Sequence, residues 1–431
     1  MRLRNEKKSL LFFHYIWLSL YLHRNSKNGK MYFDKCNVVC LVGVICLFVA
    51  SPLHAQQSDS LWKGLVHGVE VNVRPEYVFQ TNPFLQGDNM KGKPVRGAFS
   101  AHLKYRFRYR PGSLLDRIYG GVYQGVGIGR YAFGESEQIG TPLALYLFQG
   151  ARIATVAPGL SFNYEWNFGL STGWVTYMEN SYNKMMGSKM NAYINAGFYF
   201  NWLLTPQLNV NAGVTLSHFS NGNTNIPNAG LNTIGLKLGL AYTFCDRVMG
   251  EDLRNPKRGE VPDFRRHVTY DVVFFGSWRR RGFDIGDGQY PSPEAYPVFG
   301  FQFSPMYNLG YKLRLGVSLD GVYDGSANVR LAENADGYDI RPSDIIDPEL
   351  YQQLALGISG RIEYVMPFFT VGIGFGGNFL GYGEFKVFYQ MLALKIALSR
   401  EIFVHVGYNL QEFRTPSFLM LGVGFRFNNK P

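Results

Sequence analysis

From Val66 onward, the chain is a succession of short segments in which apolar and polar residues alternate, separated by turn residues. Alternation with a period of two is typical of β-strands, whose successive side chains point to opposite faces of a sheet. No stretch reaches the ~20 consecutive apolar residues that a membrane helix needs. Hydrophobic residues still make up 46% of the chain and charged residues only 17%, which excludes a disordered protein. The sequence therefore predicts an all-β fold, and the interleaved glycines and aromatics favour a barrel.

We expect sixteen strands, eight on each side of Cys245. They cover about 66–79, 97–110, 114–132, 141–155, 159–173, 190–203, 207–219, 231–244, 267–279, 295–306, 309–324, 351–365, 368–380, 384–398, 401–413 and 417–427. Tight connections such as 110–113 alternate with long ones such as 80–96. Transmembrane barrels of bacterial outer membranes have this pattern, with even strand numbers, short periplasmic turns and longer extracellular loops.

The two halves of the chain resemble each other. The segment Leu208–Leu216 aligns with Ile402–Leu410, and each half closes with a strand of Gly-x-x-aromatic-x-aromatic type, Gly239–Phe244 and Gly422–Phe427. We interpret this as an internal duplication of an eight-stranded unit. The sequence leaves open whether the units form two tandem barrels or one barrel of sixteen strands.

Residues 1–55 are typical of a targeting segment. Met31 begins a short N-terminal region that contains Lys35, Val38–Ala50 is an apolar run too short to span a bilayer, and the small residue Ala55 ends the segment at a cleavage site. The alternative is an N-terminal anchor helix. The predicted organisation is an N-terminal extension with a signal peptide (1–55), a first barrel (56–245), a polar linker (246–266) and a second barrel (267–431).

The positive charge of the chain lies largely in this targeting segment. The net charge is +11, but eight of the 43 basic and only two of the 32 acidic residues lie in the first 55 residues. Nucleic-acid binding therefore loses its main support. Three of the four cysteines lie in the same segment, so the exported chain would keep only Cys245. An internal disulfide and a cysteine-based metal site are both excluded.

Candidate catalytic residues lie near the end of the predicted strand 207–219. Its even-numbered residues are apolar and should face lipid, and His218 and Ser220 continue this register. Asn232 begins the same face of the next strand, 231–244. Because the two strands are antiparallel and joined by a loop, we expect these three polar residues to meet on the outer face at the extracellular rim.

A serine and a histidine two residues apart on one strand face can form an activated nucleophile. The carbonyl oxygen of Asn232 can accept the other ring N–H of His218 and fix its tautomer, although it cannot stabilise the imidazolium by charge. Loop amides and the side chains of Asn221 and Asn228 are candidate donors to the oxyanion of an acyl transfer.

The motif His218-Phe219-Ser220-Asn221, followed by Pro227-Asn228-Ala229-Gly230-Leu231-Asn232, resembles the H-x-S-N…P-N-x-G-x-E signature of the PagL-type lipid A 3-O-deacylases. The resemblance covers about residues 60–245. It implies an eight-stranded outer-membrane barrel that hydrolyses the acyl ester at the 3-position of lipid A without metal or cofactor. It also implies that His218 is the general base and Ser220 the nucleophile. Position 232, where this chain has Asn and the family has Glu, orients the histidine.

We therefore predict an outer-membrane esterase of a Gram-negative bacterium that acts on lipid A or lipopolysaccharide in the outer leaflet. The second half has Glu412 and Arg414 where the first has His218 and Ser220, and we expect it to be catalytically silent. Two other functions stay open. One is a non-enzymatic barrel, porin-like or structural, and the other is a phospholipase that uses the same dyad.

Overall fold

The structure is a computed structural model. It describes residues 64–245, 259–286, 288–332, 340–413 and 415–429. The predicted signal peptide within 1–55 lies outside the described residues, as does most of the predicted linker. In the described part, no helix has the length and apolar character to cross a membrane.

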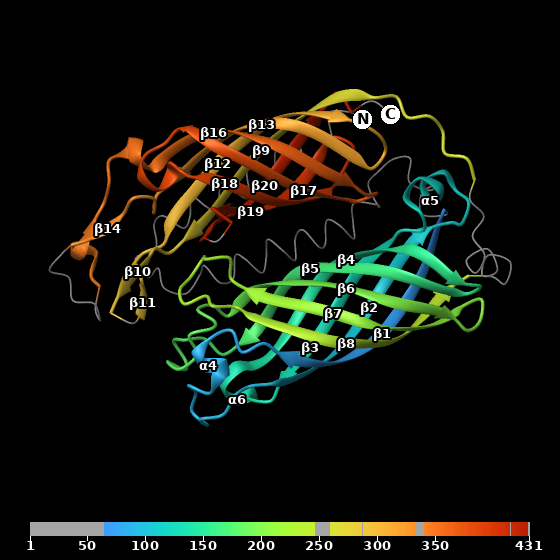
Figure 1. Ribbon diagram of the computed structural model, residues 1–431, viewed down its shortest axis with the longest axis horizontal. Helices are drawn as coiled ribbons and strands as arrows, with labels where there is room; N and C mark the ends of the chain where they lie inside the picture. Colours follow the sequence, from blue (N-terminus) through green and yellow to red (C-terminus); the bar gives the residue numbers. More distant parts are fainter. Residues whose placement is uncertain (1–63, 246–258, 287, 333–339, 414, 430–431) are drawn as a thin grey trace, which may run out of the picture. The chain divides into compact units, whose positions relative to one another are not determined.

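The first unit is a closed antiparallel barrel of eight strands (Figure 1). Its strands are β1 (Leu65–Val78), β2 (Gly97–Tyr109), β3 (Tyr123–Phe133), β4 (Gly140–Ala157), β5 (Leu160–Trp174), β6 (Met190–Leu203), β7 (Leu208–Ser220) and β8 (Leu231–Phe244). Pairing of β1 with β8 closes the ring, so neither strand is left with an exposed edge. Three short helices lie in its connections: α4 (Pro83–Gln86), α5 (Leu114–Tyr119) and α6 (Ser136–Ile139).

Helix α5 corrects two expectations. We predicted one strand over 114–132 and a tight turn at 110–113, but the chain forms a helix before β3 begins at Tyr123. The Ser113 side chain caps the helix by accepting a hydrogen bond from Asp116 N, and Gly120 ends it in the left-handed conformation. A serine cap and a C-terminal glycine are local helix signals that outweigh the apolar alternation of this segment.

The second unit is also a closed barrel of eight strands (Figure 1). Its strands are β9 (His267–Arg279), β12 (Tyr296–Asn308), β13 (Leu313–Asp324), β16 (Leu354–Val365), β17 (Phe369–Leu380), β18 (Phe388–Ala397), β19 (Ile402–Gln411) and β20 (Thr415–Phe427). Its loops carry the small pairs β10 (Gly282–Ile285) with β11 (Gly288–Pro291) and β14 (Arg330–Leu331) with β15 (Ile345–Ile346), and the 3-10 turns η3 (Pro342–Asp344), η4 (Leu350–Gln353) and η5 (Gly383–Phe385). The fold is therefore the duplicated eight-stranded barrel in its two-barrel form.

The outer and inner faces of the first barrel differ as alternation requires. Leucines of β7 and β8 that point outward, such as Leu216 and Leu236, are more than half exposed. Inside, Lys104 contacts Glu165 at 2.6 Å, and Lys237 contacts Glu70 at 3.0 Å. An apolar exterior and a polar, charge-paired interior are the arrangement that a barrel in a bilayer needs.

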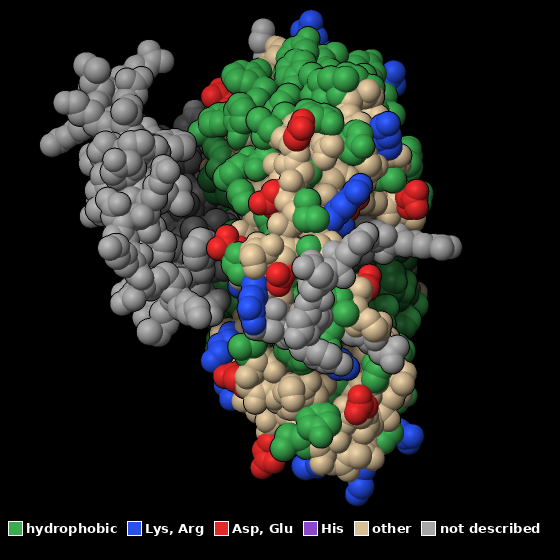
Figure 2. Space-filling model, turned by 90° about the vertical axis from the view of Figure 1, so that its left-hand side faces the viewer, with side chains coloured by type: hydrophobic (Ala, Val, Ile, Leu, Met, Phe, Trp, Pro, Cys, Tyr) green, Lys and Arg blue, Asp and Glu red, His purple; other side chains and the backbone are tan. Residues whose placement is uncertain are grey.

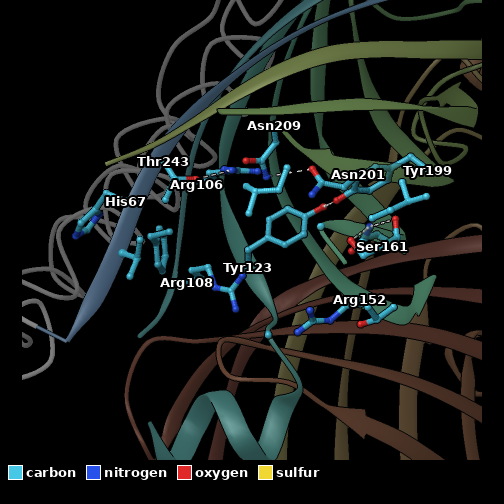
Figure 3. Close-up of a pocket in the computed structure, with 18 residues that line it drawn as sticks. His67, Arg106, Arg108, Tyr123, Arg152, Ser161, Tyr199, Asn201, Asn209 and Thr243 are labelled. Atoms are coloured by element: carbon cyan, nitrogen blue, oxygen red, sulfur yellow. Dashed lines mark hydrogen bonds between the residues drawn. The ribbon is translucent and has the colours of Figure 1, made fainter. Parts of the chain in front are cut away.

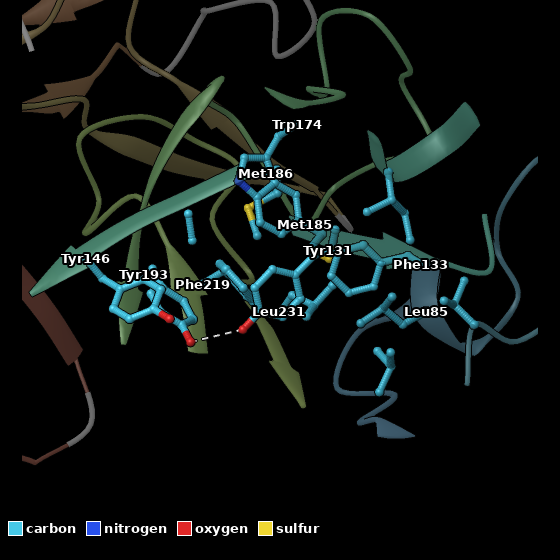
Figure 4. Packing of buried hydrophobic residues seen from close by; sticks show 14 of the residues in the cluster. Leu85, Tyr131, Phe133, Tyr146, Trp174, Met185, Met186, Tyr193, Phe219 and Leu231 are labelled. Atoms are coloured by element: carbon cyan, nitrogen blue, oxygen red, sulfur yellow. Dashed lines mark hydrogen bonds between the residues drawn. The ribbon is translucent and has the colours of Figure 1, made fainter. Parts of the chain in front are cut away.

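Aromatic side chains close the interior near the end that carries the longer loops, which we call the extracellular end. Tyr131 donates a hydrogen bond to Tyr193 at 3.0 Å, and Phe219 packs edge-on against Tyr131 and Trp174 (Figure 4). Tyr131, Tyr193 and Phe219 are fully buried. The lumen at this end of the first barrel is thus filled with side chains.

Basic and acidic side chains are interspersed on the molecular face shown in Figure 2, and neither sign gathers into one patch there.

Candidate active site

The β7–β8 hairpin brings together the predicted nucleophile, base and orienter. His218 and Asn232 are directly opposite each other in the β7–β8 register. The ring atom His218 Nδ1 lies 2.7 Å from Asn232 Oδ1, and His218 Nε2 lies 2.9 Å from Ser220 Oγ. Both distances are those of good hydrogen bonds, so the imidazole bridges the hydroxyl and the amide.

This arrangement determines which nitrogen carries the proton. A carbonyl oxygen can only accept, so Asn232 Oδ1 requires the proton of a neutral imidazole to be on Nδ1. The Nε2 atom then carries a lone pair and accepts the hydrogen bond from Ser220. A histidine in this tautomer is ready to act as a general base toward the hydroxyl.

Phe219, between the two catalytic candidates, explains why they face outward. Its ring is fully buried in the aromatic cluster of the lumen. Because side chains alternate along a strand, His218 and Ser220 must then point to the outer surface, where both are half-buried. Phe219 is a positioning residue that the sequence analysis missed, although its inward register was implicit in the same alternation.

The loop between β7 and β8 is held together by asparagine side chains. Asn228 Oδ1 accepts a hydrogen bond from Asn221 N at 3.0 Å, and Asn228 Nδ2 donates to Asn223 at 3.0 Å. Asn221 Nδ2 donates to the carbonyl of Asn225 at 3.0 Å. Of the two predicted oxyanion donors, Asn221 therefore directly follows Ser220 and Asn228 is hydrogen-bonded to it, and the amide groups of both side chains bind within the loop.

Gly230 is a second residue that the sequence analysis did not single out. Its φ of 70° lies in the left-handed region, and a Cβ atom built there would stand 3.3 Å from His218 Cε1 and 3.1 Å from the carbonyl of Phe219. The absence of a side chain lets the loop backbone lie against the imidazole. The signal available in the sequence was a glycine two residues before the orienting position.

The preceding extracellular loop braces this hairpin. Gly230 N donates to the carbonyl of Met185, and Asn225 Nδ2 donates to the carbonyl of Gly187 at 2.7 Å. Met185 and Met186 are fully buried in the aromatic cluster. The loop that carries the asparagines is therefore anchored to the barrel interior.

The second barrel has no matching arrangement in the part of the chain that the structure describes. Strand β19 ends at Gln411, and Glu412, which aligns with His218, lies beyond it with a φ of 51°. Among the described residues of both barrels, no three His, Cys, Asp or Glu side chains are grouped so that they could hold a metal ion.

Comparison with known proteins gives two family matches. Residues 101–241 match the family described as lipid A 3-O-deacylase (PagL), and residues 268–429 match the family described as acyloxyacyl hydrolase, C-terminal domain (PagL_C). No curated protein sequence matches the chain.

Three of the similar solved structures each match about two fifths of this chain. The outer membrane enzyme PagL has 13% identity, with 39% of this chain and 97% of that chain covered and a TM-score of 0.29. Neisserial surface protein A has 11% identity, covering 41% and 97%, with a TM-score of 0.28. The N-terminal β-barrel domain of Pseudomonas aeruginosa OprF has 11% identity, covering 41% and 97%, with a TM-score of 0.22.

Proposed function

We propose that this chain, whose first barrel belongs to the lipid A 3-O-deacylase (PagL) family, hydrolyses the ester-linked acyl chain at the 3-position of lipid A by acyl transfer to Ser220. The observation that carries the proposal is the chain of two hydrogen bonds from Asn232 through His218 to Ser220. The family supports the hydrolase class and the lipid A substrate. The geometry supports the mechanism.

In the first step, His218 Nε2 takes the proton of the Ser220 hydroxyl as Oγ attacks the ester carbonyl carbon. The resulting tetrahedral intermediate carries a negative charge on the former carbonyl oxygen, which the second N–H of the Asn221 or Asn228 side-chain amide, the one not used within the loop, stabilises. Its collapse breaks the bond to the sugar oxygen, and the imidazolium returns the proton to that oxygen. Lipid A leaves with a free 3-hydroxyl, and the acyl chain stays on Ser220.

In the second step, His218 takes a proton from water as the water attacks the acyl-serine carbonyl. Collapse of this second intermediate releases the fatty acid, and the proton returns to Ser220 Oγ. Throughout both steps, the carbonyl oxygen of Asn232 holds the Nδ1–H and keeps the ring in orientation.

The outward orientation of the dyad supports a membrane lipid as substrate. His218 and Ser220 continue a strand face whose residues Val214 and Leu216 are exposed and apolar, and such a belt faces the acyl chains of a bilayer. An ester at headgroup depth in the outer leaflet meets this face directly. The same belt and the family support an outer-membrane location.

The test is mass spectrometry of lipid A and of phospholipids from cells expressing the chain. Wild-type protein should remove one hydroxy-fatty acid from lipid A, and Ser220→Ala should abolish this loss. Ser217→Ala is a matched control on the same strand, because its hydroxyl points inward and accepts from Asn195. Persistence of the loss in Ser220→Ala would refute the nucleophile, and fatty-acid release from phospholipids alone would identify a phospholipase.

A further inference from the structure

A cavity in the first barrel and a groove on the second differ in the chemistry of their walls. The cavity inside the first barrel is lined by polar side chains such as Asn201, Asn209 and Thr243 (Figure 3). The groove on the second barrel has a volume of about 760 Å³, and its walls are mostly phenylalanine, leucine and tyrosine. Ligand sites have volumes of about 300–1,000 Å³. The groove is therefore large enough for a ligand, and its walls fit hydrocarbon.

This groove lies on the outer face of the second barrel. Phe299 of β12, Leu354 of β16 and Leu380 of β17 line it with exposed side chains. The same strands bury polar side chains such as Gln302 and Ser359 on their inner face. Leu354 begins β16 directly after the long connection from β13, and long connections are extracellular in such barrels. The groove therefore opens to the outer leaflet of the membrane.

One wall of the groove is built from loops that are tied together. The rings of Tyr351 and Tyr382 pack edge to face, with their centroids 5.9 Å apart. Asn328 Nδ2 donates to the carbonyl oxygen of Gln352 at 2.7 Å and to that of Tyr382 at 3.2 Å, and Asn328 Oδ1 accepts from Glu384 N at 3.1 Å. One side chain thus fixes both segments that carry the tyrosines. A wall that is already ordered binds a flexible chain at a lower entropic cost.

A cation lies at the edge of this wall. Lys386 is exposed, and its Nζ lies 5.8 Å from the centre of the Tyr382 ring. Glu384, two residues away, accepts two hydrogen bonds from the guanidinium of Arg281. In the described part of the chain, no carboxylate forms an ion pair with Lys386. A lysine in this position attracts the phosphate of an anionic lipid.

We propose that the groove binds one acyl chain of lipid A and that Lys386 holds a phosphate of the same molecule. The apolar walls take the hydrocarbon, and the tyrosines lie at the boundary between acyl chains and headgroups. Lipid A has both chemical groups and lies in the leaflet to which the groove opens. The second barrel is then a lipid A-binding module that needs no catalytic residue. This inference rests on the outer-membrane location and does not depend on the proposed reaction at Ser220.

Photolabelling of the full chain in detergent micelles tests the proposal. The probe is lipid A with a photoreactive diazirine in one acyl chain, and the chain carries Ser220→Ala so that the first barrel cannot consume the probe. Peptide mass spectrometry then locates the label. We expect severalfold more label at 351–356 and 380–382 than at Val317 and Leu392, which are exposed on the outer face away from the groove. Equal labelling would indicate contact with bulk lipid alone and would overturn the proposal.

Competition identifies the lipid. An excess of unlabelled lipid A should remove the label from the groove, whereas the same excess of phosphatidylglycerol should leave most of it. Equal competition by the two lipids would overturn the assignment to lipid A.

Variants test the two parts of the site. Lys386→Gln should lower the label in the groove about fivefold, which is the effect of one surface cation on an anionic lipid. Lys184→Gln is the matched control, because Lys184 is an exposed lysine on an extracellular loop of the first barrel. Asn328→Ala should also lower the label, because it releases the loops that carry Tyr351 and Tyr382. An unchanged label in Lys386→Gln, or an equal loss in Lys184→Gln, would overturn the role of Lys386.

Discussion

Replacement of Asn232 by aspartate tests the role of the orienting residue most directly. The two side chains have the same size and shape, so Asn232→Asp places a carboxylate oxygen where the amide oxygen now lies 2.7 Å from His218 Nδ1. The neutral imidazole of the resting state gains little from this charge. The imidazolium that forms in the transition state gains an ion pair, so the stabilisation is differential.

The magnitude follows from the geometry. With charge centres about 4 Å apart, the attraction is about 1 kcal/mol in bulk water and about 4 kcal/mol at an effective dielectric of about 20. His218 and Asn232 are half-buried at the rim, so an intermediate value of about 2 kcal/mol applies. Since 1.36 kcal/mol is a factor of ten in rate, Asn232→Asp should raise kcat about thirtyfold.

The assay is release of hydroxy-fatty acid from lipid A by purified protein in mixed micelles. Asn232→Leu is the matched control, because it keeps the number and branching of the side-chain heavy atoms and removes the acceptor, and it should lower kcat about tenfold or more. Asn232→Glu is one methylene longer and should keep or raise activity. The reasoning is refuted if Asn232→Asp is no more active than the wild type.

Three further outcomes are expected. Gly230→Ala should lower kcat at least about tenfold, because its Cβ would press on His218. Gly92→Ala is the control and should leave kcat unchanged, because it has the same left-handed backbone cost of about 1 kcal/mol but no atom within 4 Å of the added Cβ. Equal effects of the two substitutions on kcat would contradict a role for the contact between Gly230 and His218. In urea unfolding, Lys104→Met should lower the free energy of unfolding by about 3–5 kcal/mol, because it removes the buried cation that pairs with Glu70 and Glu165. Lys91→Met is the control: Lys91 pairs with Glu135 at the surface, and its replacement should have no measurable effect on the free energy of unfolding. In planar bilayers, the protein should give no stepwise conductance, because side chains fill the lumen of the first barrel in the described part of the chain; reproducible channel steps would favour a porin-like function.

The fold was predictable because its signal is local. The period-two alternation of β7 assigns Leu216 to lipid and Ser217 to the interior, and the same rule predicts that His218 points outward. The strands β6 and β8 were placed with the bounds that the structure has, Met190–Leu203 and Leu231–Phe244. The choice between one barrel and two could not be made, because it depends on which distant strands close each ring.

The features that escaped prediction depend on contacts between residues far apart in sequence. Asn328 joins Gln352 to Tyr382 across loops that are separate in the sequence, and the pairing of Lys104 with Glu165 crosses the lumen. Helix α5 differs from these features, because its cap at Ser113 is a local signal, but the apolar alternation around Ser113 predicts a strand there.

All groups of the proposed triad lie on a single hairpin, between positions 218 and 232. Sorting, insertion and folding of a barrel depend on all eight strands, but this chemistry depends on two neighbouring ones. A gene encoding such a barrel can therefore gain or lose the enzyme by changes within fifteen consecutive codons, without rebuilding the scaffold. A duplicated copy can therefore keep its closed barrel while the hairpin that corresponds to the site becomes shorter. The hairpin of β19 and β20 in the second barrel has this form.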